Sequence, residues 1–247
     1  LISTNIISEG GKMKKFVVCG LFLALTTAAL SAGDVATFVD KGFSEDGKYY
    51  IFGQYGRTDK KYQGWAEIYQ VDIASNDYVD GGVFKTKPSA STVDKSGSEV
   101  YESLEAKSYY YLKKIPVKPA NPEHVLYICD DPNKAGSDKI EFKDFRTANK
   151  DKAYTYSVQL VQTVVKSGKE LKSSFYIMVE KKDSNGNIVY RTKVGNPDIQ
   201  RKLISGYKIV KIMCDESEQN MIFVVEKTQE DDTGISIRYM VEAAKVQ

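Results

Sequence analysis

The feature that most restricts the fold of this chain is an alternation of apolar and polar residues with a period of two. It is clearest over Ala66–Ile73, and it recurs at 154–160 and 175–179. Successive side chains of a strand point to opposite faces, so each stretch predicts a strand with one buried face. The 17 tyrosines and 10 phenylalanines also favour half-buried pleated surfaces. We therefore predict a mainly β fold.

Turn residues between these strands indicate antiparallel pairing. Segments 175–180 and 188–193 flank Asp183–Asn187, and the central Asn185-Gly186 tolerates the positive φ angles of a tight turn. Antiparallel sheets of this kind form either a sandwich or a propeller-like fold. Both arrangements remain open from the sequence.

One helix is predicted near 98–114, because apolar residues recur there at helical spacing. Ser98 is the expected N-terminal cap, and Pro116 ends the helix. We treat 33–247 as a single β-rich domain with this helix inserted. In the alternative, the helix and linker at 91–122 join two β sub-units, 33–90 and 123–247.

Residues 13–32 have the pattern of a secretory signal peptide. Lys14 and Lys15 precede the uncharged apolar run Phe16–Leu30, and small residues follow at Ala29–Ala32. The run is shorter than the ~20 residues of a membrane-spanning helix. We expect export to the periplasm or beyond the cell, with no membrane span in the mature form. Residues 1–12 precede Met13 and are expected to be a mis-annotated leader.

Charge argues against nucleic acid as a partner. The chain has 35 basic and 33 acidic side chains, and residues 1–32 contain three of the lysines and one glutamate. The rest of the chain is therefore neutral overall, without the clustered basic excess that nucleic acid requires.

Each candidate catalytic motif has a simpler structural interpretation. His124 is the only histidine and is expected to be a partly exposed loop residue. Asp232-Thr233-Gly234 spells an aspartic-protease tripeptide, but a hairpin turn is favoured because no second copy exists. Ser205–Lys208 has Ser-x-x-Lys spacing without the companion motifs of penicillin-recognising enzymes.

Metal and disulfide chemistry are not predicted either. The oxygen-rich loop around Gly136 is expected to hold solvated turn residues, because it lacks the order of a calcium loop; its members are Asp130, Asp131, Asn133 and Asp138. Cys129 and Cys214 are expected to be separate thiols, with one disulfide as the alternative. We assign no catalytic, cofactor-binding or metal-binding residue and expect no cofactor.

Several short stretches are similar to a family of predicted secreted bacterial proteins of unknown function. They are Gly33–Ala36, Phe52–Gly56, Ala66–Tyr69, Ser174–Ile177 and Ile237–Glu242. The resemblance implies export and a shared fold, and it transfers no catalytic residues. In addition, Phe43–Phe52 followed by Ile68–Asp72 looks like one blade motif of TolB-type β-propellers.

These observations predict an exported cell-envelope protein that acts as a non-catalytic binding or interaction module. Its expected ligand is an envelope protein or a glycan. The alternative is an envelope hydrolase with an unrecognised active site that uses His124 or a group of acids. An enzyme should show a pocket where such residues converge, whereas a binding module should show an exposed aromatic patch.

Translation is expected to start at Met13 and the exported protein near Gly33, because the signal pattern ends at Ala32. N-terminal sequencing of the exported protein measures both points. Retention of Phe16–Leu30 in that product would contradict the prediction.

Overall fold

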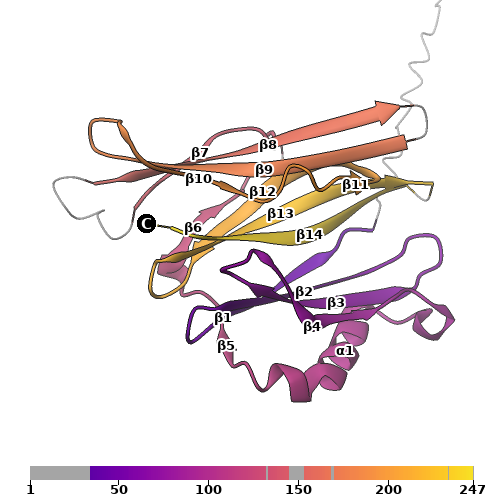
Figure 1. Ribbon diagram of the computed structural model, residues 1–247. Coiled ribbons are helices and arrows are strands. Elements are labelled where there is room, and N and C mark those ends of the chain that lie inside the picture. The colour runs from indigo at the N-terminus through magenta and orange to yellow at the C-terminus, as the bar shows by residue number, and fades with distance from the viewer. Residues whose placement is uncertain (1–33, 132, 145–152, 168–169, 233, 247) are drawn as a thin grey trace, which may run out of the picture. The chain divides into compact units, whose positions relative to one another are not determined.

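The computed structural model describes residues 34–131, 133–144, 153–167, 170–232 and 234–246 (Figure 1). The predicted leader at 1–12 and signal segment at 13–32 lie outside these residues. Residues 31–247 group into one unit by their contacts. The described chain is mainly β, as the alternation predicted, with one α-helix, α1 (Gly97–Leu112), and two short 3-10 helices, η1 (Ala90–Thr92) and η2 (Pro122–His124).

The strands form three antiparallel sheets. The N-terminal sheet has the order β4 (Asp77–Thr86), β3 (Gly64–Asp72), β2 (Tyr49–Arg57), β1 (Thr37–Ser44) and β5 (Val117–Lys118). The middle sheet has the order β14 (Gly234–Lys245), β13 (Asn220–Asp231), β12 (Ile204–Cys214) and β6 (Val125–Ile128). The outer sheet has the order β10 (Ile188–Val194), β9 (Glu170–Lys182), β8 (Thr155–Ser167) and β7 (Ile140–Lys143), and β11 (Arg201–Lys202) pairs with β9.

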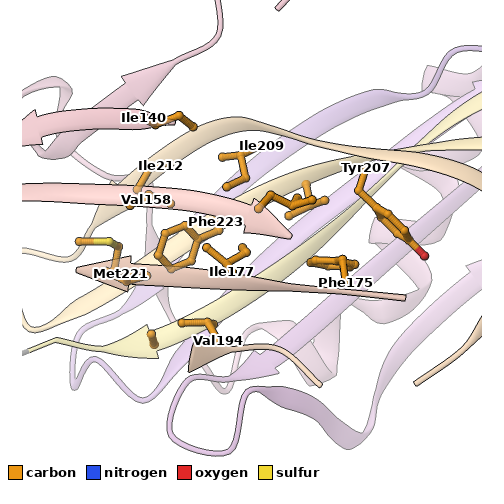
Figure 2. Close-up of a cluster of buried hydrophobic side chains, with 14 of the residues drawn as sticks. Ile140, Val158, Phe175, Ile177, Val194, Tyr207, Ile209, Ile212, Met221 and Phe223 are labelled. Atoms are coloured by element: carbon orange, nitrogen blue, oxygen red, sulfur yellow. The ribbon is translucent and has the colours of Figure 1, made fainter. Parts of the chain in front are cut away.

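The middle sheet packs against a sheet on each face, as in a sandwich with three layers. One core cluster joins it to the outer sheet through residues such as Phe223 and Phe175, which Figure 2 shows. A second cluster joins it to the N-terminal sheet through residues such as Ile222 and Phe52. Residues 220–225 of β13 are therefore all buried. A strand covered on both faces must be apolar on both, and Met221–Val225 meets that requirement.

Helix α1 covers the other face of the N-terminal sheet. Val100, Tyr101 and Leu104 pack there against Ile51 and Ile68 of the sheet. The expected cap at Ser98 is wrong, because Ser96 caps the helix. The Ser96 hydroxyl accepts from the Glu99 N–H, and the Glu99 side chain accepts from the Ser96 N–H. This reciprocal pair gives hydrogen-bond partners to two backbone N–H groups at the start of the helix. A helix that began at Ser98 would not have this pair.

The linker after the helix joins the same sheet, since β5 pairs with the end of β1. No helix among the described residues is long and apolar enough to cross a membrane.

Antiparallel geometry keeps the two cysteines apart. β6 and β12 are neighbours, as the sequence allowed, and Ile128 pairs with Lys211 while Val125 pairs with Met213. Cys129 therefore follows one end of the pair and Cys214 lies at the other, near the His124 carbonyl. The two cysteines form no disulfide; Cys214 is buried and Cys129 partly buried.

The predicted hairpin is confirmed: β9 and β10 pair in antiparallel register on either side of the turn. The Asp183 carboxylate accepts the N–H groups of Asn185 and Asn187 at 2.9 and 2.8 Å. Its hydrogen bonds with Asn187 lower the pKa of Asp183 below the ordinary value. Gly186 has φ +83°, and a side chain there would meet no atom within 4 Å.

Gly186→Val should therefore destabilise the protein through backbone strain alone, by about 1 kcal/mol or more, because a β-branched residue resists positive φ. Urea unfolding measures the loss, and Ser184→Val in the same exposed turn is the matched control. Equal stability of the two variants would contradict the turn assignment.

Candidate functional site

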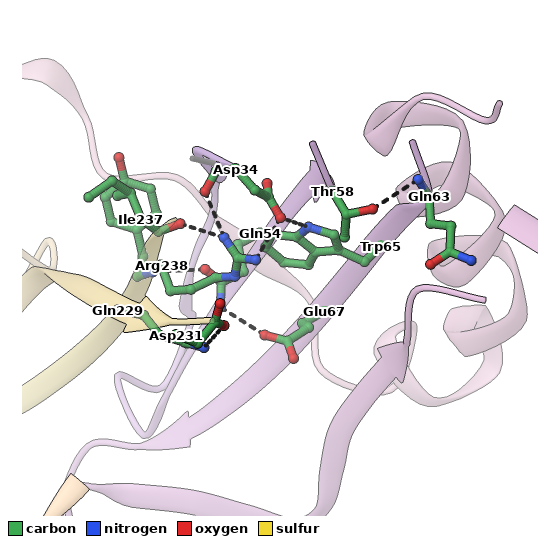
Figure 3. Close-up of polar contacts among 11 residues, drawn as sticks. Asp34, Gln54, Thr58, Gln63, Trp65, Glu67, Gln229, Asp231, Ile237 and Arg238 are labelled. Carbon is green, nitrogen blue, oxygen red and sulfur yellow. Dashed lines mark hydrogen bonds and ion pairs between the residues drawn. The ribbon is translucent and has the colours of Figure 1, made fainter. Parts of the chain in front are cut away.

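The N-terminal and middle sheets meet through a chain of buried polar contacts as well as through apolar packing (Figure 3). Asp34 accepts from Trp65 Nε1 and Arg238 Nη2, both at 2.6 Å, and the Arg238 guanidinium lies 4.0 Å from the centre of the Trp65 ring. Gln54 Nε2 donates to Glu67 at 2.8 Å. The Trp65–Asp34–Arg238 contacts connect the two sheets through charge-assisted hydrogen bonds, whereas the Gln54–Glu67 contact lies within the N-terminal sheet.

Side chains and the N-terminal segment satisfy the free edge of β14. The N–H groups of Ile237, Tyr239 and Ala243 donate to the Asp34 carbonyl, the Gln54 side chain and the Asn76 side chain, at 3.0, 2.8 and 2.6 Å. Strand alternation points the N–H of Val241, between them, in the same direction. An edge whose N–H groups already have hydrogen-bond partners is protected from pairing with a strand of another chain.

A cleft of about 660 Å³ opens beside this edge, and we call it the β14 cleft. Its walls come from all three sheets and the loops between their strands. It is lined by Tyr69, Val71, Ser75, Asn76, Asp77, Tyr78, Lys85, Gly195, Asn196, Ile199, Arg201, Lys227, Met240, Val241 and Glu242. Its volume is in the range typical of small-molecule sites.

Two of the three cations in the cleft already have partners. Lys85 Nζ lies 3.1 Å from Glu67 Oε1 and donates to the Tyr69 hydroxyl at 3.0 Å. Arg201 lies 3.9 Å from Glu242 Oε1, and its guanidinium stacks 5.0 Å from the centre of the Phe175 ring. Both side chains are held in place by these contacts.

Lys227 differs from the other two cations. Its side chain is half-buried, and no hydrogen bond or ion pair joins its amine to any residue that the structure describes. Burial lowers the pKa of Lys227 to about 8, and the charges of Arg201, Lys85 and Arg238 add to the effect while Glu67 opposes it. A lysine with this pKa is about half neutral at pH 8.

Glu242 and the two phenols of the cleft, Tyr69 and Tyr78, have pKa values raised toward their neutral forms. Burial raises the pKa of Glu242, although a hydrogen bond from Asn76 and the Arg201 charge oppose the rise. Burial and the Glu67 carboxylate raise the pKa of Tyr69 well above its usual range, so Tyr69 stays a phenol. The cleft can therefore present cations and hydrogen-bond donors to a polar ligand.

A second cleft, of about 630 Å³, lies where the β1–β2 and β12–β13 turns meet the linker after α1. Acids outnumber bases in its wall, and they include Asp46, Asp72 and Asp215. Asp215 accepts from Asn220 and Ser217, and Asp46 accepts from Ser44. Among the described residues no group of acids, histidines and cysteines is arranged to hold a metal ion.

The motifs considered in the sequence lie apart from the β14 cleft. His124 ends η2, beside Cys214, and is partly buried. Ser205–Lys208 lies within β12. The predicted turn at 232–234 is confirmed, because Asp231 pairs with Gly234 across the β13–β14 hairpin; Thr233 itself lies outside the described residues.

The oxygen-rich loop is exposed, as expected. Two of its carbonyls accept from distant side chains, Asp131 from Lys208 and Ser137 from Gln159, and its carboxylates accept local N–H groups. Asp131 accepts the Asn133 N–H and Asp138 accepts the Ala135 N–H. Exposed aromatic side chains occur on α1, where Tyr109 and Tyr110 lie 5.6 Å apart between ring centres.

The cleft residues were missed in the sequence because five strands far apart in the chain supply them. The sequence contains no signal at Lys227. It lies two residues beyond Val225 on the face of β13 where Met221, Phe223 and Val225 are buried against the outer sheet. Every residue from Glu226 to Asp232 is polar, so a lysine there is ordinary in the sequence.

A family model described as "Predicted secreted protein (DUF2259)" matches residues 51–245 of the chain. No curated protein and no solved structure matches the chain.

Lys227→Met should raise the free energy of unfolding at pH 7 by about 1 kcal/mol, because it removes a half-buried charge without a partner and keeps the apolar length. Urea unfolding, followed by the fluorescence of the single tryptophan Trp65, measures the change. Lys85→Met is the control of opposite sign: it should lower stability by about 0.5–1 kcal/mol, because Glu67 and Tyr69 lose a partner. A destabilised Lys227→Met would show that Lys227 has a structural role.

Proposed function

We propose, since the chain belongs to the DUF2259 family of predicted secreted proteins, that it is an exported binding module of the cell envelope and that its ligand enters the β14 cleft. The ligand carries an anionic group, as acidic glycans and organic acids do. The observation that carries the proposal is the amine of Lys227, which has no hydrogen-bond or ion-pair partner among the described residues and lies in the same cleft as Arg201 and Lys85.

Electrostatics support an anion as the ligand. A cation without a partner in a half-buried cleft is costly to the folded protein, and a bound anion would remove that cost. Arg201 is held by its stacking on Phe175 and Lys85 by Glu67. Both are therefore oriented before a ligand arrives, which reduces the entropy lost on binding.

Binding is preferred to hydrolysis because the groups that would perform hydrolysis do not converge on the cleft. His124 is absent from its lining, and Asp77 and Glu242 are its two carboxylates. Glu242 is hydrogen-bonded to Asn76 and faces Arg201, an arrangement that fits a structural role.

Inorganic pyrophosphate and citrate are suitable probes. Each is titrated at low salt into protein purified from the exported fraction, and calorimetry measures the binding. We expect one saturable site whose affinity falls as salt screens the charges. Lys227→Met should weaken binding about tenfold, the equivalent of one charge-assisted hydrogen bond.

Lys202→Met is the matched control, because Lys202 is the exposed neighbour of Arg201 in β11 and is absent from the cleft lining. This variant should bind pyrophosphate and citrate with the affinity of the unaltered protein. Equal losses in the two variants would show that the anions bind the general surface, and the proposal would fail.

A further inference from the structure

The amine of Lys227 has a second chemical property besides its charge. A neutral amine is a nucleophile, and lysines become nucleophilic in proteins when they are desolvated or lie near other cations. Lys227 meets both conditions, since it is half-buried and shares the cleft with Lys85 and Arg201. No described residue holds its lone pair or its proton in a hydrogen bond.

The surroundings of the amine favour a ligand with two functional groups. Arg201 and Lys85 can hold an anionic group, while Val71, Met240 and Val241 contribute apolar surface to the cleft. An anion held by these cations would place the rest of a small ligand beside the amine.

Resting on the proposed function, we infer that the β14 cleft captures small anionic aldehydes or ketones, such as oxo-acids and phosphorylated or acidic sugars, as a reversible imine with Lys227. The neutral Nζ attacks the carbonyl carbon, so that a C–N bond forms and the carbonyl oxygen takes up a proton. Loss of that oxygen as water, with both protons of the amine ending in water or solvent, leaves the C=N bond. No oxidant or reductant is required.

Pyridoxal 5′-phosphate with sodium cyanoborohydride tests the inference, because reduction turns the imine into a stable amine that peptide mass spectrometry locates. We expect Lys227 to be modified at least ten times faster than the exposed Lys202. Pyridoxal, which lacks the phosphate, should show little preference for Lys227, and pyrophosphate should protect it. Arg201→Met should reduce the advantage of the phosphorylated probe.

The rate should also rise as pH increases through about 8, as the amine loses its proton. The charged and titratable groups around it come from every neighbouring element: Glu67 and Tyr69 of β3, Asp77, Tyr78 and Lys85 of β4, Arg201 of β11, Tyr207 of β12, and Arg238 and Glu242 of β14. The pKa of Tyr69 is raised and its phenol does not titrate in this range, so a single rise is expected. A rate that increases only above pH 10 would overturn the inference.

Lys227→Arg tests the imine directly, because arginine keeps the charge and cannot form the imine. The variant should lose the modification in the cleft, while the exposed Lys202 is still modified at its slow rate. Labelling spread evenly over surface lysines, while pyrophosphate still binds the unaltered protein, would overturn the imine and leave the binding function standing. Failure of pyrophosphate to bind at all would overturn both.

Discussion

The structure depends on burying the middle sheet on both faces. β13 contributes residues 220–225 to the interior, and its neighbours supply apolar side chains to two separate cores. The central part of such a sheet is covered on both faces, so the polar groups at its edge are paired within the protein. Gln54, Asn76 and the Asp34 carbonyl provide them along β14. The β14 cleft lies beside this edge, where apolar packing gives way to polar contacts.

Alternation in the sequence predicted the strands well, because it reports which side of a strand is buried. It could not report what covers the buried side. Ile222 and Phe223 face different sheets, yet both are simply apolar in the sequence. The number and order of the sheets therefore stayed open between sandwich and propeller-like folds, and contacts between distant residues decide it. The start of α1 was placed two residues late, although Ser96 and Glu99 already had the spacing of a capping box.

The site was harder to predict than the fold, for a physical reason. Tyr69 and Glu242 line one cleft but are far apart in the chain, and neither belongs to a recognisable motif. The motifs that match those of known enzymes, such as Asp232–Gly234, lie in turns and strands. Their residues are accounted for there by the secondary structure. Lys227 stands in a polar stretch of the sequence that begins at Glu226. What sets it apart is a half-buried amine with no partner among the described residues, which only the structure shows.

The contact between the N-terminal segment and β14 has a consequence for the order of events in folding. Val35 forms a parallel bridge with Ile237, and the Arg238 side chain holds Asp34. These contacts join residues about 200 positions apart, whereas most strands of the three sheets pair with their neighbours in the sequence. The edge of the middle sheet cannot be completed until β14 has left the ribosome. The N-terminal segment therefore stays undocked while the rest of the chain is being made, which leaves the start of the exported part free of the fold until the end of synthesis.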